Sequence, residues 1–417
     1  MNYPVVKGAA YALIQANGML LHQGTTQTSE KRNNPDSDHL KKLPDHLRSF
    51  QQAVAYPPNQ AYIGNITPDE LKAIPRPWFE NSQADAPRTG KYGEILPEDE
   101  FLAMMKMVDI FDLLHRLSGP KGIVRQTEFF LYSDKDKEAV AQCRERGYEF
   151  PQITGWIRAH AKDLALVKEM GLKETGILTS VSDYHIFLKL NWGRKKAMDE
   201  YLGIVKAALD QGIIPRCHFE DVTRADIYGF CVPFAIELMK LREESGVDIK
   251  MRLCDTMGYG VPYPGAALPR SVPKLVRAMI DDAGVPGHLL EWHGHNDFHK
   301  VLVNSVTAWL YGCGAVNGAL LGFGERTGNA PIEGMLIEYI SLRGTTDGIG
   351  TTVISEIGEY FERELRYHIP PNYPFVGKNF NNTSAGIHAD GLLKNEEIYN
   401  AFDTGKILNR PIRITIT

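Results

Sequence analysis

The feature that most constrains the fold is a regular alternation of strand-like and helix-like segments after about residue 121. The predicted strands cover residues 122–132, 152–159, 174–180, 212–219, 249–255, 289–295 and 315–321. The predicted helices between them cover residues 134–146, 162–170, 194–210, 230–244, 270–283 and 299–311, the first capped by Ser133. This order predicts parallel strands joined by right-handed crossovers. Seven units within about two hundred residues favour a (β/α)8 barrel over an open sheet.

One strand of the eight is missing from this pattern, and we expect it to be the first. The preceding part of the chain has another character, with frequent prolines and strands expected only near residues 4–13 and 61–66. Residues 98–117 read as one amphipathic helix. This N-terminal part offers no acidic residue at the end of a convincing barrel strand, and without a first strand the barrel keeps two unpaired edges.

The pattern changes again after residue 350, to a helix at residues 354–365, a proline-rich link and a loop-rich segment. The chain stops in what reads as an interrupted strand, residues 412–417. We therefore predict an α/β protein with an incomplete (β/α)8 barrel over residues 108–350. An α+β fragment at residues 1–107 precedes this barrel, and a truncated helical and loop appendage at residues 351–417 follows it.

Composition excludes several classes of function. The net charge of −5, with 23% charged and 43% hydrophobic residues, is typical of a globular protein and predicts no nucleic-acid partner. No apolar run is long enough to span a membrane, and no export signal is visible. The five cysteines are odd in number and widely spaced. We therefore expect a reducing cytoplasm rather than a disulfide scaffold.

The sequence Glu291–Asp297 holds a His-x-His pattern at the end of a predicted strand. Because residues i and i+2 of a strand point the same way, His293 and His295 are expected to project their imidazoles side by side. Two such imidazoles form half of a divalent metal site. The alternative is that these two histidines bind no metal, since an isolated His-x-His is more often structural or surface-exposed.

Polar residues also cluster where the other predicted strands end, which in barrels of this type is the rim of the active site. They are Glu128, Ser182, His185, His218, Glu220, Asp255, Thr256 and Asn329. His218 and Glu220 share one face of a strand, so they either line the pocket or form a hydrogen-bonded pair in the core. Thr256 is suited to bind a substrate carboxylate, whereas Asp255 reads as structural.

Two further patterns carry alternatives. Glu128 either orients substrate and assists proton transfer or is a carboxylate satisfied within a barrel layer. The glycines of residues 322–328 suggest a phosphate loop, but no Lys-Ser/Thr follows them, so that interpretation is weak.

From about residue 108 onward the chain resembles the pyruvate-carboxyltransferase-like (DRE-TIM) barrels, which include isopropylmalate synthase, homocitrate synthase and HMG-CoA lyase. The likeness is strongest to the Re-face citrate synthases. Seven strings in family order carry this resemblance: Arg125–Phe130, Ser180–His185, His218–Asp221, Cys254–Gly258, His293–Asp297, Gly324–Asn329 and Ser384–His388.

Residues 1 to about 112 resemble a different family, the component C beta subunit of glycine/sarcosine/betaine reductase, a thiolase-like acyl-transfer protein. The strings that carry this likeness are Met1–Tyr11, His22–Gln27 and Gly93–Glu100. If both resemblances hold, the chain is a chimera joined around residues 107–114.

The barrel resemblance implies a divalent cation (Mn2+, Mg2+ or Co2+) held by His293, His295 and Asn329 together with an Asp from strand one. It implies substrate contacts from Ser182, His185, His218 and Thr256, and acid–base roles for Glu128, Glu220 and His388. In the family, the histidine corresponding to His388 often reaches the site of a neighbouring subunit, so a homodimer is expected. The alternative is that His388 is a loop histidine without a catalytic role. The strand-one motif is not found, and residues 88–93 stand where it should lie.

Three functions compete at this stage. The first is a Claisen-type condensation of acetyl-CoA with a 2-oxo acid, oxaloacetate foremost, in which the cation polarises the ketone. The second is an inactive fusion, or a protein that only associates, because the strand-one motif is missing. The third is acyl transfer of the component C kind, which needs a nucleophilic cysteine. Residues 1–107 contain none, and all five cysteines lie in the barrel part.

Overall fold

The computed structural model describes residues 97–415, with side chains from Met104 onward. The predicted strands at residues 4–13 and 61–66 and the strings Met1–Tyr11, His22–Gln27 and residues 88–93 lie outside this described range. Within it, the alternation expected from the sequence is present. The strands are β1 (Gln126–Phe130), β2 (Gln152–Arg158), β3 (Glu174–Ser180), β4 (Ile214–Glu220), β5 (Lys250–Asp255), β6 (Leu290–Gly294) and β7 (Ala315–Asn317).

These seven strands form one curled sheet in the order β1 to β7, as in a TIM barrel, and every pairing from β2 to β7 is parallel. Among the described strands, β1 and β7 are the edges, so the sheet does not close. The prediction of an incomplete (β/α)8 barrel is therefore confirmed. Sequential strand order follows from the crossover rule, because each helix returns the chain to the neighbouring position.

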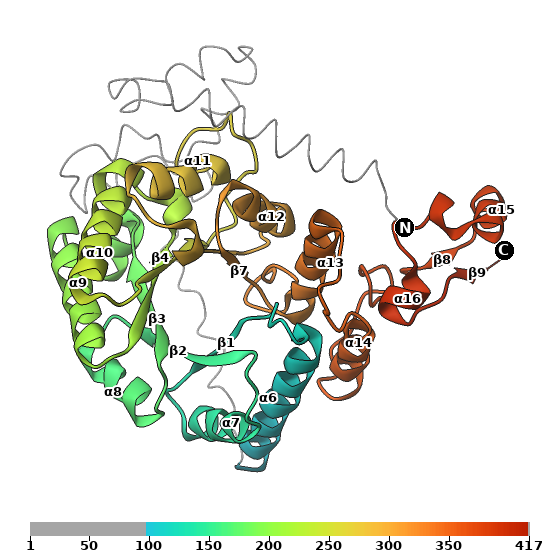
Figure 1. The fold of residues 1–417 in the computed structure, drawn as a ribbon, viewed down its shortest axis with the longest axis horizontal. Coiled ribbons are helices and arrows are strands. Elements are labelled where there is room, and N and C mark those ends of the chain that lie inside the picture. The colour runs from blue at the N-terminus through green and yellow to red at the C-terminus, as the bar shows by residue number, and fades with distance from the viewer. Residues whose placement is uncertain (1–96, 416–417) are drawn as a thin grey trace, which may run out of the picture. The chain divides into compact units, whose positions relative to one another are not determined.

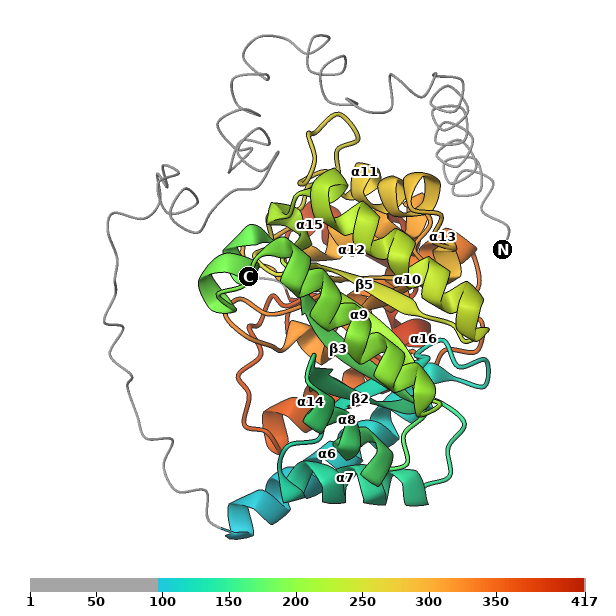
Figure 2. The same ribbon diagram turned by 90° about the vertical axis from the view of Figure 1, so that its left-hand side faces the viewer.

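The crossover helices lie outside the curled strands (Figures 1 and 2). They are α8 (Ala161–Glu169), α9 (Arg194–Asp210), α10 (Val232–Ser245), α11 (Val272–Arg277) and α12 (Val301–Tyr311). Their ends follow local chemistry: the Ser271 hydroxyl caps α11 at the Lys274 amide, and Gly246 ends α10 with φ 68°. The sequence therefore sets helix boundaries through single cap residues.

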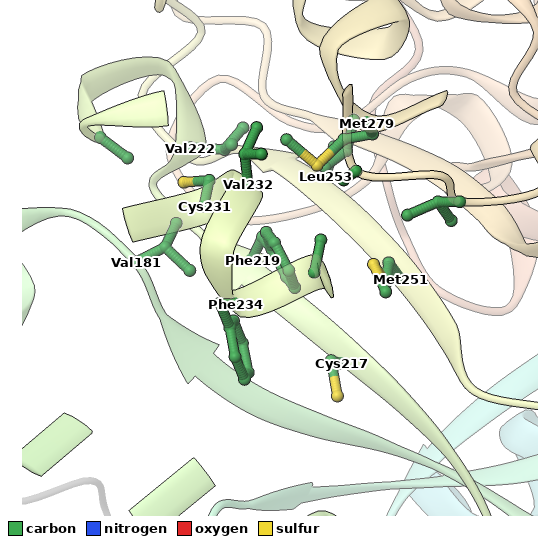
Figure 3. Close-up of a cluster of buried hydrophobic side chains, with 14 of the residues drawn as sticks. Val181, Cys217, Phe219, Val222, Cys231, Val232, Phe234, Met251, Leu253 and Met279 are labelled. Atoms are coloured by element: carbon green, nitrogen blue, oxygen red, sulfur yellow. The ribbon is translucent and has the colours of Figure 1, made fainter. Parts of the chain in front are cut away.

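The main hydrophobic core lies between the outer face of the sheet and these helices (Figure 3). Cys217 and Phe219 of β4 are fully buried, as is Phe234 of α10, and the rings of Phe219 and Phe234 stack with centroids 5.1 Å apart. Because successive strand residues face opposite ways, the residues between them, His218 and Glu220, point to the inner face. Packing on the outer face thus directs the polar residues inward.

A cluster of buried charges, which we call the charged layer, lies toward the start of the central strands. It consists of Glu174, Arg216, Lys250, Arg252 and Glu291. Glu174 accepts from Lys250 at 2.8 Å and from Arg216 at 3.0 Å, and Glu291 accepts from Arg252 at 2.8 Å. Although burial alone would raise the pKa of Glu291, Arg216 and Arg252 lower it to about 2. Glu291 is therefore ionised, and the layer pairs its carboxylates with basic side chains.

The described chain separates into two compact units, one formed by Gly155–Ala330 and the other by the residues up to Thr154 together with Pro331 onward. The second unit contains α6 (Pro97–Ser118), α7 (Asp134–Glu145), α13 (Ile332–Arg343), α14 (Val353–Arg363), α15 (Gly386–Lys394) and α16 (Thr404–Leu408). It also holds a two-stranded parallel sheet, β8 (Asn382–Thr383) and β9 (Arg413–Ile414). Helices α6 and α14 are joined by a bidentate contact of Arg116 with Glu356 at 2.7 Å. The three-segment division of the sequence stays a prediction.

Two strands next to the His-x-His pattern end earlier than predicted. The strand expected at residues 315–321 ends at Asn317, because Leu321 adopts φ 53° in a short 3-10 turn, Leu320–Gly322. The strand expected at residues 289–295 ends at Gly294, and His295 instead forms an isolated bridge with Asn329. Both deviations lie where the chain turns toward the Gly324–Asn329 string.

Candidate functional site

A row of five side chains crosses the inner face of the sheet at the carboxyl ends of five neighbouring strands. The strand register aligns Ser180 with Glu220, Glu220 with Cys254, Cys254 with His293, and His293 with Asn317. Aligned residues of neighbouring strands point to the same face. We call this set the terminal row, and it brings together residues that are up to 137 positions apart, from Ser180 to Asn317.

His293 and His295 converge as the sequence predicted. Their Nε2 atoms are 3.1 Å apart, and the two rings are nearly perpendicular, at 80°. His293 belongs to β6, whereas His295 is held one residue beyond it by the bridge to Asn329. Two ligands at adjacent positions of an octahedral cation, with bonds of about 2.1–2.2 Å, lie about 3.0–3.1 Å apart. The separation therefore matches that of a pair of metal ligands.

Two neighbours contact the outer nitrogens of these rings. The Asn317 Oδ1 atom lies 2.7 Å from Nδ1 of His293, so this nitrogen donates its proton to the carboxamide. Arg326 donates to Nδ1 of His295 at 2.7 Å and also contacts Asp297, at 3.0 Å. Burial first, and then the Arg326 charge, lower the pKa of His295. A neutral imidazole, the form that binds metal, is thereby favoured.

Asn329, whose backbone bridges to His295, carries a third candidate group. Its carboxamide Oδ1 is buried and has no hydrogen-bond partner in the described part of the chain. The amide is confined by Gly324, where a Cβ would lie only 2.7 Å from the Asn329 Nδ2 atom. A buried carbonyl oxygen left unsatisfied costs about 1–3 kcal/mol, so this oxygen is suited to a cation.

The donor set of two imidazole nitrogens and one carboxamide oxygen fits a divalent cation of hard or borderline character. Within residues 104–415, however, no three His, Cys, Asp or Glu side chains gather in a way that could hold a metal ion. The acidic ligand expected on strand one is thus not found among these residues. The fit concerns the three neutral donors alone.

Glu220 forms a second centre at the other end of the terminal row. Its carboxylate is 3.0 Å from Nδ1 of His185 and 3.0 Å from Lys189 Nζ, and it accepts a short hydrogen bond from Ser180. Burial alone would raise its pKa, but His185, Ser180 and Lys189 together lower the pKa of Glu220 to about 2. A carboxylate this weakly basic is a better orienting group than proton acceptor at neutral pH.

Asp221 engages two of the predicted substrate residues. Its carboxylate accepts from the Ser182 hydroxyl at 2.5 Å, and its backbone amide donates to the Thr256 hydroxyl at 2.9 Å. Asp221 itself has a left-handed backbone, with φ 66°. The hydroxyls of Ser182 and Thr256 are therefore fixed at neighbouring strand ends, and their role toward substrate stays a prediction.

His218 and Asp255 are both deeply buried. Trp156 donates to Nδ1 of His218 at 3.2 Å, while burial, with further contributions from Arg252 and Arg216, lowers the pKa of His218 well below its usual range. Asp255 accepts from the Thr223 hydroxyl at 2.7 Å and from the Gly260 amide at 2.9 Å. These bonds tie the segments that follow β4 and β5 to the end of β5, which supports the structural interpretation of Asp255.

The remaining two predicted residues belong to the other compact unit. Glu128 lies in the middle of β1 and is partly buried. His388 is exposed on α15, where its ring packs against Tyr399 with centroids 4.3 Å apart. Their catalytic roles stay predictions, because only the unit Gly155–Ala330 holds the terminal row.

Sequence reasoning assigned no role to Asn317, Arg326 or Lys189. Asn317 had a usable signal, since it is a polar residue two positions into a predicted strand at the barrel rim. Arg326 lies in the Gly324–Asn329 string, but a residue pattern does not say which side chain reaches His295. Lys189 follows a predicted strand by nine residues and gave no signal.

None of the helices among residues 97–415 combines the length and the apolar character that a membrane crossing requires.

Comparison with known proteins places these residues in context. Residues 107–360 match the model of the HMGL-like family. A Citrate (Re)-synthase of Syntrophus aciditrophicus is 72% identical over 312 residues, covering 75% of this chain and 50% of that protein. A Citrate (Re)-synthase of Clostridium kluyveri is 55% identical over 312 residues, covering 75% of this chain and 69% of that protein. The chain thus spans half the length of the first relative.

The N-terminal part matches a different protein. A glycine/sarcosine/betaine reductase complex component C subunit beta of Peptoclostridium acidaminophilum is 56% identical over 116 residues, covering 27% of this chain and 23% of that protein. Both resemblances found in the sequence are therefore confirmed.

Proposed function

The chain belongs to the HMGL-like family, and we propose that it condenses acetyl-CoA with a 2-oxo acid, most specifically oxaloacetate to give citrate. Identity of 72% to a Citrate (Re)-synthase over the barrel part supports the substrate class. The observation that carries the proposal is the convergence of His293 and His295, whose Nε2 atoms are 3.1 Å apart, beside the unsatisfied Oδ1 of Asn329.

We propose that His293, His295 and Asn329 hold a divalent cation (Mn2+, Mg2+ or Co2+). When bound, such a cation supplies Lewis-acid polarisation of a ketone. The chain's own residues prepare the site: Asn317 and Arg326 fix the two rings, and Gly324 confines the carboxamide. The Asn317 contact prepares His293 in this way, whereas His295 must carry its ring proton on Nδ1, away from the Arg326 contact, before its Nε2 atom can bind a cation.

The Glu220 centre supports acid–base work by a histidine. Glu220 stays ionised and lies 3.0 Å from Nδ1 of His185, so its charge stands next to a histidine that is proposed to move protons. Ser182 and Thr256, fixed by Asp221, are proposed to bind the carboxylates of the 2-oxo acid, with His218 lining the pocket. Glu128 and His388 remain proposed acid–base groups, His388 toward the partner of a homodimer.

Component C chemistry is disfavoured by the cysteines. All five are buried, and burial raises the pKa of the Cys143 thiol to about 12. A nucleophilic thiol needs the opposite shift. Five free cysteines also support the proposed cytoplasmic location.

The test is a titration of the full chain with Mn2+ by calorimetry, followed by release of free CoA from acetyl-CoA and oxaloacetate. We expect a single Mn2+ site, a sharp thermal transition that Mn2+ shifts upward, and CoA release that needs oxaloacetate. His293→Gln is expected to abolish both binding and CoA release.

The matched control is His288→Gln, which removes an exposed histidine from the same segment of the chain. It should leave both measurements unchanged. No Mn2+ binding and a broad, metal-insensitive melt would instead support the inactive fusion.

A further inference from the structure

Asn317 is the last residue of β7 and the end of the terminal row. The register of β6 and β7 places it directly beside His293, and its carboxamide oxygen lies 2.7 Å from Nδ1 of that ring. Both residues stand on paired strands, so their separation is set by the ladder rather than by a loop. The contact is therefore preorganised by the sheet.

The direction of this hydrogen bond decides what His293 can do. A neutral imidazole carries one ring proton, and the nitrogen that does not carry it is the acceptor or ligand. Because Nδ1 donates to Asn317, the lone pair of His293 is at Nε2, which faces His295 Nε2 at 3.1 Å. Without an acceptor at position 317, the other tautomer would place a proton where the cation should bind.

The second histidine has no equivalent acceptor. Nδ1 of His295 receives a bond from Arg326, which has no acceptor of its own to offer. In the metal-free chain, the Nε2 atom of His295 therefore carries the proton that is directed at His293. Of the two rings, His293 alone is already arranged as a ligand.

We propose that Asn317 is a positioning residue for the cation: its carboxamide oxygen holds His293 in the Nδ1–H tautomer with Nε2 directed into the site. This inference rests on the proposed metal-dependent function. It makes β7 a contributor to the site through a residue that itself touches no substrate. Partners of this kind, which bind the far nitrogen of a metal-bound histidine, raise metal affinity about 10–100-fold.

The experiment compares Mn2+ affinity, by calorimetry and by the electron paramagnetic resonance signal of free Mn2+, across the full chain and three variants. Asn317→Leu keeps the volume but removes the acceptor, and we expect affinity to fall about 10–100-fold. Asn317→Asp keeps an acceptor at the same place, and we expect affinity at least equal to that of the unchanged chain.

Asn304→Leu is the matched control, because Asn304 is a buried amide of α12 that donates to the Gly260 carbonyl at 2.9 Å. It should lower the melting temperature without changing Mn2+ affinity. Unchanged affinity in Asn317→Leu would overturn the proposal. Equal losses in Asn317→Leu and Asn317→Asp would also overturn it, since the hydrogen-bond acceptor would then not be what matters.

A second readout needs no metal and separates this inference from the proposed function. The ring 15N shifts of His293 in the metal-free chain, assigned by comparison with His293→Gln, report which nitrogen is protonated. We expect protonated Nδ1 in the unchanged chain and in Asn317→Asp, and loss of this preference in Asn317→Leu. If the chain binds no Mn2+, the metal-dependent function fails; if His293 carries its proton on Nε2, the role of Asn317 fails.

Discussion

The charged layer and the terminal row lie on the same inner face of one sheet, two to six residues apart along strands β3 to β6. They differ in how their polar groups are paired. In the charged layer, two carboxylates face three cations, and each carboxylate is contacted by basic groups within 2.8–3.0 Å. At one end of the terminal row, Nε2 of His293 lies 3.1 Å from Nε2 of His295, and the carboxamide oxygen of Asn329, whose backbone bridges to His295, is unsatisfied.

This difference shows how buried polar residues that stabilise the fold can be told apart from those that bind a ligand. Buried polar groups are normally satisfied by one another, and the two carboxylates of the charged layer follow this rule. Asn329, which bridges to His295 beside one end of the terminal row, breaks it, whereas Glu220 at the other end contacts His185 and Lys189. The surplus of acceptors at one end indicates a missing positive partner. Burial and charge alone would not have distinguished the two layers.

The largest expected effect comes from breaking the charged layer. Glu291→Gln leaves Arg252 and Arg216 without their shared carboxylate in a buried position. We expect the free energy of unfolding, measured with urea at pH 7, to fall by about 3–5 kcal/mol, because removing one member of a buried ion pair leaves an uncompensated charge.

Glu356→Gln is the control for this experiment. It breaks the ion pair between Glu356 and Arg116, whose side chains are 45% and 52% exposed, respectively. The free energy of unfolding should fall by about 1 kcal/mol or less. Similar losses in both variants would show that the charged layer contributes no more than a surface pair.

The next effect concerns the unsatisfied end of the terminal row. Asn329→Ala removes a carboxamide whose oxygen has no partner. Without metal, we expect the free energy of unfolding of this variant to lie within about 1 kcal/mol of that of the unchanged chain. Mn2+ affinity should nevertheless fall at least about 100-fold, equivalent to about 2.7 kcal/mol. Calorimetric titration and urea unfolding measure the two quantities. A large stability loss with unchanged affinity would make Asn329 structural and contradict the contrast drawn between the layers.

The smallest effect is the pH dependence of the paired end. The pKa of Glu220 is about 2 in the folded chain, against an ordinary value of 4.5. Its contribution to stability is thus present above about pH 4.5 and is lost as the pH falls toward 2. Glu220→Gln should therefore show a shallower loss of unfolding free energy over this window than the unchanged chain. If the free energy of unfolding depends on pH in the same way in both proteins, His185 and Lys189 do not lower the pKa of Glu220 in solution.

Local patterns predicted some elements to the residue. The strand Glu174–Ser180 and the helix Arg194–Asp210 have the predicted bounds, and Ser133 caps α7 through the amide of Asp136. Each of these features depends on side chains within a few positions of one another, so periodicity and cap chemistry are sufficient. The predicted strand at residues 315–321 failed because a left-handed Leu321 is not visible in a hydrophobic pattern.

By itself, the sequence determined the parallel α/β order of the seven described strands and the placement of His293 and His295 at one strand end. Only the tertiary structure decided which distant side chains meet them. Asn317 reaches His293 because β6 and β7 pair in one particular register, and Arg326 reaches His295 because a glycine-rich turn folds back onto β6. Register and loop return are long-range properties, set by the packing of whole elements, whereas periodicity and caps are written within a few neighbouring residues.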